Sequence, residues 1–246
     1  MTLTAFGLNC SLKSSKEASS TDKLLGEVLA ALASQGVSTA GTVRVADRNI
    51  RPGVTSDEGD GDEWPALRQQ ILEADIFVLA TPIWMGHPSS HAQRVLERLD
   101  AFLGETDPTG RMVSLDRVAI VAVVGNEDGA HHVAAELFQA LNDVGFTIAA
   151  GGMTYWVGEA MHKTDYKDLP SGSDKTDQAT KTAAATPPIW PACSPTSPTR
   201  AELARTRCPS SPAASTAPDL RSSATARPYR ADQFCRRPEV GSVPPS

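Results

Sequence analysis

Hydroxyl side chains crowd one loop near the start of the chain. An apolar run at residues 3–8 predicts a short buried strand, and apolar residues at helical spacing from Leu24 onward predict a helix. The first N–H groups of a helix have no partner within it, and the helix dipole favours negative charge there. A loop at this place therefore suits an anion, and it contains Ser11, Ser14, Ser15, Ser19, Ser20 and Thr21.

The composition of this loop favours one kind of anion. Glycines let a backbone approach a bridging pyrophosphate, whereas hydroxyls donate hydrogen bonds to a terminal phosphate monoester. The loop is rich in Ser and Thr rather than Gly, so we expect a single phosphate group. An ordinary solvated connection is an equally weighted alternative, because Ser-rich loops are common.

A second loop, at residues 81–86, suits a planar ring. Pro82 stiffens it, Trp84 supplies a flat apolar surface, and Gly86 allows a ligand to approach the backbone. A planar heteroaromatic ring would stack beside Trp84 while N–H groups between Ile83 and Met85 reach its polar edge. The alternative is that Trp84 is a core or dimer-interface residue.

A third loop, at residues 125–129, offers close backbone approach to the same ring through Gly125 and Gly129. Glu127 and Asp128 are equally consistent with plain turn residues. Because ligands of open parallel sheets bind beyond the carboxyl ends of the strands, we expect the three loops to lie together.

Strands and helices alternate along residues 3–157. Further strands are expected at residues 41–45, 75–80, 118–124 and 146–157, the last interrupted near Gly151 and Gly152, with helices between them. The β-branched run at 118–124 predicts a central strand buried on both faces. This pattern predicts an α/β fold with a doubly wound parallel sheet.

The C-terminal part breaks the pattern. A covering helix is due at residues 174–185, but no large apolar stripe supports it, so we expect it to be missing or degraded and to leave apolar surface exposed. From residue 187 Pro, Ser, Thr, Ala and Arg dominate without periodicity, which predicts a disordered tail. The expected division is a domain at 1–186 and a tail at 187–246. The abrupt change suggests a shifted reading frame.

Composition and motifs argue against several classes of protein. The net charge of −6 disfavours a nucleic-acid binder, and no leader or long apolar run indicates a membrane, so a cytoplasmic location is expected. The acidic loop at 57–63 has Arg68 where a calcium loop needs Glu. His87 and His91 lie four residues apart without an apparent third ligand, so no metal site is expected.

Residues 3–160 resemble the flavodoxin-like family of NAD(P)H-dependent FMN reductases and quinone reductases. The resemblance rests on the Ser/Thr loop that opens a helix and on Thr81-Pro82-Ile83-Trp84-Met85-Gly86 with Pro88-Ser89, which is similar to the T-P-I-Y-x-G-x-P-S flavin loop of that family. It implies a five-stranded sheet of order 2-1-3-4-5, non-covalently bound FMN and often a dimer or tetramer.

The resemblance also implies roles for residues. Ser11, Ser19, Ser20 and Thr21 would hold the phosphate; Pro82, Ile83, Trp84 and Gly86 would flank the isoalloxazine; Gly125, Asn126 and Gly129 would line the third loop. The sequence departs from the family at Asn9-Cys10, where Gly-Ser is frequent, and in the long stretch before Ser19.

The implied activity is electron transfer from NAD(P)H through FMN to a quinone or another small acceptor. No catalytic acid–base pair is required, and none is predicted. A flavodoxin-like electron carrier and a non-enzymatic nucleotide-binding module are the alternatives.

Overall fold

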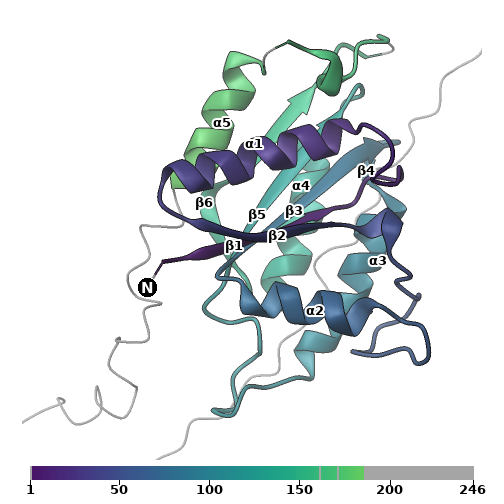
Figure 1. Cartoon of the computed structure of the whole chain (residues 1–246), viewed down its shortest axis with the longest axis vertical. Coiled ribbons are helices and arrows are strands. Elements are labelled where there is room, and N and C mark those ends of the chain that lie inside the picture. Colours follow the sequence, from purple (N-terminus) through teal and green to yellow (C-terminus); the bar gives the residue numbers. More distant parts are fainter. Residues whose placement is uncertain (1, 161, 171, 186–246) are drawn as a thin grey trace, which may run out of the picture. The chain divides into compact units, whose positions relative to one another are not determined.

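A parallel sheet forms the centre of the molecule. The computed structural model describes residues 2–160, 162–170 and 172–185. The parallel strands are β1 (Thr4–Asn9), β2 (Ser38–Arg44), β3 (Ile76–Trp84), β5 (Val118–Gly125) and β6 (Thr147–Val157), in the order β2-β1-β3-β5-β6 (Figure 1). A two-residue strand, β4 (His87–Pro88), pairs antiparallel with the end of β3. Without this short addition the order is the predicted 2-1-3-4-5, which is confirmed.

Helices cover both faces of the sheet, as Figure 1 shows. They are α1 (Ser20–Ser34), α2 (Trp64–Glu73), α3 (Ser90–Leu99), α4 (Ala130–Asp143) and α5 (Asp174–Ala185), with short 3₁₀ turns η1 (Val45–Asp47), η2 (Asp100–Leu103) and η3 (Tyr166–Asp168). Helices α2, α3 and α4 pack with Phe77 and Leu79, whereas α1 and α5 pack with Ile76 and Val78. Successive residues of one strand thus face opposite helix layers, and the presence of helices on both faces makes the sheet doubly wound.

The predicted interruption of the last strand is confirmed. The register between β5 and β6 shifts between Ala119 and Val121. A side chain at Gly152 would stand 2.9 Å from the carbonyl oxygen of Ala149, so the backbone folds tightly at this bulge.

The expectation of a missing covering helix is corrected. Helix α5 is formed, and Ala183 and Ala184 are fully buried in the core that it shares with α1. Thr180 bonds to Thr154 on β6 through their hydroxyls at 2.8 Å. Small and hydroxylated side chains permit close packing on the strand, which a search for large apolar residues misses. The face beside α1 is therefore covered.

The connection that precedes α5 is anchored on α1. Tyr166 is fully buried, and its hydroxyl donates to Glu27. Burial, together with this bond to a carboxylate, raises the pKa of Tyr166. The Lys23 ammonium donates to the carbonyl oxygen of Leu169 at 2.8 Å. The predicted tail at 187–246 and its boundary at residue 186 lie outside the described residues.

The acidic loop at residues 57–63 is held by protein groups. Asp62 forms a fully buried ion pair with Arg98 of α3, with 2.7 Å between Oδ2 and Nη2. Backbone N–H groups of Glu58, Trp64 and Arg51 also donate to this carboxylate. Burial alone would raise the pKa of Asp62, but these bonds outweigh it and hold the pKa below its usual value.

Replacing Asp62 with Asn is therefore expected to leave Arg98 as a buried cation without a counter-charge. The free energy of unfolding should fall by about 3–5 kcal/mol, measured by urea denaturation at neutral pH. Since the folded-state pKa is lowered, the deficit should be full above about pH 4 and shrink as the pH falls through the folded-state value. Asp60→Asn, in the same loop but exposed, is the control; equal losses in both variants would contradict the assignment.

Candidate functional site

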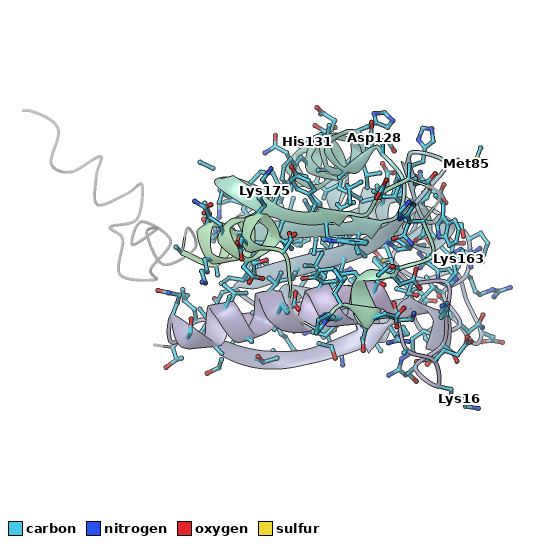
Figure 2. All side chains as sticks on the ribbon, turned by 90° about the horizontal axis from the view of Figure 1, so that it is seen from above. Lys16, Met85, Asp128, His131, Lys163 and Lys175 are labelled. Carbon is cyan, nitrogen blue, oxygen red and sulfur yellow. The ribbon has the colours of Figure 1, made fainter. Side chains whose placement is uncertain are left out.

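The three polar loops meet at the carboxyl edge of the sheet, as expected. The Ser89 hydroxyl, after the second loop, donates to the Cys10 carbonyl oxygen in the first loop at 2.6 Å. The Met85 N–H donates to Glu127 of the third loop at 2.7 Å. Figure 2 places Lys16, Met85 and Lys163, from the loops after β1, β3 and β6, toward the same end of the sheet.

The first loop is ordered by its own polar groups. Ser11 is buried, its N–H donates to Asn9 Oδ1 at 2.9 Å, and its hydroxyl accepts from the Lys13 N–H. The Arg44 guanidinium, at the end of β2, donates to the carbonyl oxygens of Ser14 and Glu17 at 2.6 and 2.8 Å. The long stretch before Ser19 is thus folded back against β2.

The start of α1 keeps donors that the helix does not use. Ser19 is the N-cap in an extended conformation, but its side chain makes no capping bond. The first backbone bond of the helix runs from the Lys23 N–H to the Ser19 carbonyl oxygen. Ser20 and Thr21 follow; the Ser20 hydroxyl accepts from the Lys167 N–H at 3.2 Å, and Thr21 is buried. Ser11, Ser19 and Thr21 are all buried, so burial does not distinguish them.

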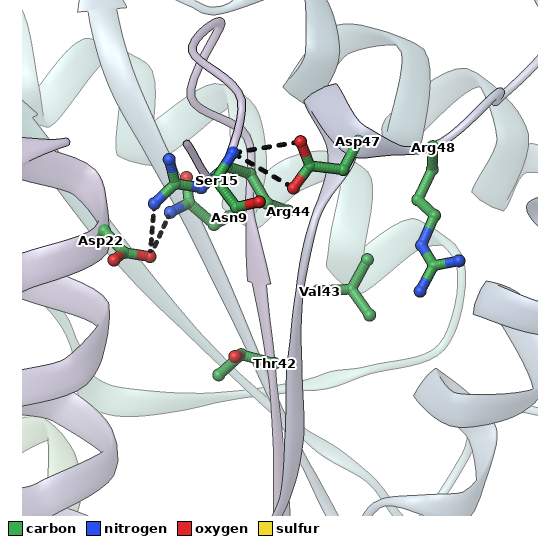
Figure 3. Close-up of a pocket in the computed structure, with 8 residues that line it drawn as sticks. All are labelled: Asn9, Ser15, Asp22, Thr42, Val43, Arg44, Asp47 and Arg48. Atoms are coloured by element: carbon green, nitrogen blue, oxygen red, sulfur yellow. Dashed lines mark hydrogen bonds and ion pairs between the residues drawn. The ribbon is translucent and has the colours of Figure 1, made fainter. Parts of the chain in front are cut away.

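A polar pocket of about 300 Å³ adjoins this loop on the β2 side, drawn in Figure 3. Arg44 pairs with Asp22 at 2.9 Å, and Asp22 also accepts from Asn9. Hydrogen bonds from Ser15 lower the pKa of Asp47, and the nearby Arg44 lowers it further. Asp22, Arg44 and Asp47 are thus bound by other groups of the protein, and the fourth charged residue of the lining, Arg48, pairs with Glu63. The remaining lining residues are Thr42 and Val43.

The second loop is a tight hairpin. Ile83 pairs with Pro88 and Trp84 with His87, so the strand β3 runs on to Trp84 instead of ending at residue 80. Met85 and Gly86 form the turn with φ of 53° and 76°, the left-handed pair of a type I′ turn.

Trp84 lies outside the hydrophobic core, which decides against one of its alternative roles. Its relative exposure is 54%, whereas Ile83 is buried and Pro82 is half-buried. A side chain at Gly125 would stand 2.9 Å from Ile83 Cβ, so Ile83 fixes the hairpin against β5. Trp84 and Gly86 therefore remain accessible to a ligand.

The third loop contacts the hairpin through backbone atoms. Gly129 has φ of 116°, and a Cβ there would stand 3.0 Å from the Gly86 Cα. Asn126 instead turns toward the last connection, where its amide donates to Asp165 at 2.9 Å. Glu127, which the sequence left as a possible turn residue, binds the Met85 N–H.

Several contacts at this edge of the sheet could not be predicted from the spacing of residues in the sequence. The Lys167 ammonium pairs with Asp165 and Asp168, both at 2.8 Å. His91 contacts the Ser11 carbonyl oxygen through Nδ1 at 3.1 Å, so it is occupied by the first loop. Burial raises the pKa of the Cys10 thiol, which keeps it protonated.

The Gly86–Gly129 contact is expected to tolerate no side chain. Gly129→Ala should lower the free energy of unfolding by about 1–3 kcal/mol, because φ and the 3.0 Å approach both oppose Cβ. Gly26→Ala in α1 is the control, since nothing lies within 4 Å of a Cβ there and a helical alanine gains up to about 1 kcal/mol. Thermal denaturation measures both; an unaffected Gly129→Ala protein would show that the two loops are not in contact.

Comparisons with known proteins agree with this architecture. The chain is 34% identical over 169 residues to 8-demethyl-8-aminoriboflavin-5′-phosphate synthase of Streptomyces davaonensis, with 65% of each chain covered. It is 36% identical over 179 residues to the divalent metal cation transporter MntH of Mycobacterium bovis, covering 71% of this chain but only 26% of the relative. The chain thus spans less than two thirds of the length of either protein. Within the described residues, no helix has the length and apolarity needed to cross a membrane.

A solved structure resembles the chain over most of its length. RosB with a bound intermediate, 8-demethyl-8-formylriboflavin-5′-phosphate, has a TM-score of 0.70 and 27% identity, with 98% of this chain and 100% of that one covered. The family model of NADPH-dependent FMN reductases matches residues 4–162, which is more than half of the chain. These residues contain the strands β1 to β6 and all three loops, so the chain belongs to the NADPH-dependent FMN reductase family, built on the flavodoxin-like fold.

Proposed function

We propose that the chain binds riboflavin 5′-phosphate (FMN) at the carboxyl edge of its sheet and passes electrons from NAD(P)H to a quinone or another small acceptor. The observation that carries this proposal is that the first loop, which leads into the hydroxyl-rich start of α1, is bonded to the residue that follows the exposed tryptophan hairpin, through the Cys10 carbonyl oxygen and the Ser89 hydroxyl. One end suits the phosphate and the other suits the ring.

The residues present fit such a flavin. Ser11, Ser19 and the unbonded N–H groups at the start of α1 would receive the phosphate, with Ser20 and Thr21 beside them. The half-exposed Trp84 would lie against the ring, with Pro82 and Gly86 at its border. FMN, when bound, would accept hydride and release electrons; the protein supplies position and polarity.

Glu127 has a defined part in this arrangement. Its carboxylate accepts from the Met85 N–H, which is the backbone donor that the exposed side of the hairpin offers. A polar ring edge would compete with Glu127 for this donor. Glu127 thus holds the hairpin in shape in the protein as described, and its negative charge disfavours an anionic ring at this edge.

A second candidate treats the flavin phosphate as the substrate. The Streptomyces relative is named a synthase of an aminoriboflavin phosphate, and RosB holds a formylriboflavin phosphate as an intermediate. Both names describe a changed substituent on the flavin ring. The same site of this chain would bind that substrate through the same phosphate loop.

We also propose a cytoplasmic protein that forms a homo-oligomer.

Flavin binding is expected to depend on the helix start. Ser19→Ala removes one hydroxyl donor to the phosphate, worth about 1.5 kcal/mol, so the dissociation constant for FMN should rise about tenfold. Ser34→Ala, at the other end of α1, should leave it unchanged. Fluorescence quenching of FMN measures both constants. Because the Ser19 side chain makes no capping bond, both variants should unfold at similar temperatures; equal FMN affinities would place the phosphate elsewhere.

Electron transfer is expected on anaerobic mixing of the FMN-loaded protein with NADH or NADPH. Reduction of the bound FMN by the nucleotide should remove its visible absorption. The absorption should return when a quinone is added and reoxidises the flavin. A protein whose FMN stays oxidised with both nucleotides would not be a reductase, which favours an electron carrier. A protein that takes up no FMN would be neither a reductase nor a flavin electron carrier.

The substrate candidate has its own readout. Aerobic incubation with FMN followed by mass spectrometry of the extracted flavin should show an unchanged mass if FMN is only the cofactor. A new flavin mass would favour the second candidate.

A further inference from the structure

Two histidines and a glutamate lie close together beside the β3–β4 hairpin that contains Trp84. His87 lies in β4, directly after the Gly86 turn, whereas His132 and Glu136 lie on α4. Their ligand atoms, two imidazole nitrogens and a carboxylate oxygen, all lie within 4.8 Å of one another. It is the one group of three or more such residues found among the residues that the structure describes.

The imidazoles of His87 and His132 both contact the same carboxylate oxygen of Glu136. Glu136 Oε1 lies 2.9 Å from His87 Nδ1 and 2.7 Å from His132 Nε2. The two imidazole rings lie edge to face, with centroids 5.1 Å apart. The three side chains therefore converge on one point instead of merely sharing a surface.

The backbone sets this convergence. His132 and Glu136 are four residues apart on a helix of 14 residues, which puts both on one face. His87 is held by its pairing with Trp84 in the hairpin. The close approach of Gly129 to Gly86 fixes the start of α4 against the hairpin turn, one residue before His87 and three before His132.

We propose that His87, His132 and Glu136 form a binding site for a first-row divalent cation of the zinc type. Imidazole nitrogen and carboxylate oxygen are common ligands of such ions, and three of them leave a fourth position for water. Hard cations such as Mg²⁺ prefer oxygen ligands, so they are poor candidates.

The site needs only small movements to close. Zinc ligands lie ~2.0–2.2 Å from the ion, so ligand atoms of a tetrahedral site lie ~3.4 Å from each other. The N–O contacts of 2.7 and 2.9 Å must widen by about 0.7 and 0.5 Å to meet that spacing, and the two nitrogens, which lie within 4.8 Å of each other, must also reach it. Side chains of His87 and His132 are 62% and 57% exposed, so they have room to rotate.

A bound ion would tie the hairpin that contains Trp84 to the first two turns of α4. This position lies next to the proposed flavin site, but the proposal does not depend on flavin binding. His91, which the sequence suggested as the partner of His87, is not a member because it contacts the Ser11 carbonyl oxygen.

The experiment uses the full chain after treatment with a chelator. Zn²⁺ is titrated against a chromophoric indicator in the wild type and in His87→Gln and His132→Gln. We expect the wild type to withdraw one equivalent of Zn²⁺, and each variant to bind it at least about tenfold more weakly, since even loss of a supporting residue costs roughly 10–100-fold. Zn²⁺ should also raise the unfolding temperature of the wild type but not of His87→Gln or His132→Gln.

His162→Gln is the matched control. His162 is equally exposed and also pairs with a glutamate, Glu159, but only two ligands meet there. Its variant should bind Zn²⁺ like the wild type. Cysteines elsewhere in the chain could also take zinc, so Co²⁺ is tested too; intense near-ultraviolet thiolate bands would reveal them. Equal Zn²⁺ affinity in all four proteins, or no uptake by the wild type, would overturn the proposal. Neither result would alter the test of FMN binding.

Discussion

The buried hydroxyl of Ser89 connects the parts on which the candidate site depends. It accepts from the Ala92 N–H as the N-cap of α3 and donates to the Cys10 carbonyl oxygen in the first loop. The Ser89 N–H also donates to the Thr81 hydroxyl within β3. One side chain thus satisfies a helix start and a loop carbonyl in a place that water does not reach. The phosphate loop and the tryptophan hairpin are in contact because of this junction.

Two further contacts explain why the hairpin can expose its aromatic residue. Ile83 packs into the core against Gly125, and Gly86 rests on Gly129. With the backbone held on both sides, Trp84 does not need to bury its ring to keep the turn in place. A tryptophan side chain is normally largely buried. The position of Trp84 is therefore fixed by the backbone contacts on either side of it and not by burial of its own ring.

The fold was largely predictable because its signals are local. The β-branched run at 118–124 identifies β5, and alternating strands and helices identify the doubly wound sheet. Strand β4 leaves no local signal of this kind, because only its pairing with β3 reveals it. Helix α5 was missed because Ala183 and Thr180 are small residues whose packing depends on the strand beneath them.

The candidate site was predictable to the level of its loops but not of its contacts. The loops that contain Ser11, Trp84 and Gly129 lie at one edge of the sheet because the carboxyl ends of parallel strands share that edge, which topology alone implies. The bond from Met85 to Glu127 joins residues 42 positions apart, and His87 meets Glu136 across 49. Such pairs leave no spacing pattern in one sequence, since their separation is set by the loops between them.

The exposure of Trp84 bears on how one site can suit two kinds of chemistry. A ring that lies against this side chain is covered on the hairpin side and bounded by the Gly86–Gly129 backbone. Its other side is not enclosed by any part of the hairpin. A nicotinamide could approach there to deliver hydride, and so could a reagent that changes a substituent of the ring. The first loop, proposed to hold the far end of the flavin, would not distinguish the two cases. The choice between cofactor and substrate would therefore rest on which molecule reaches the open side.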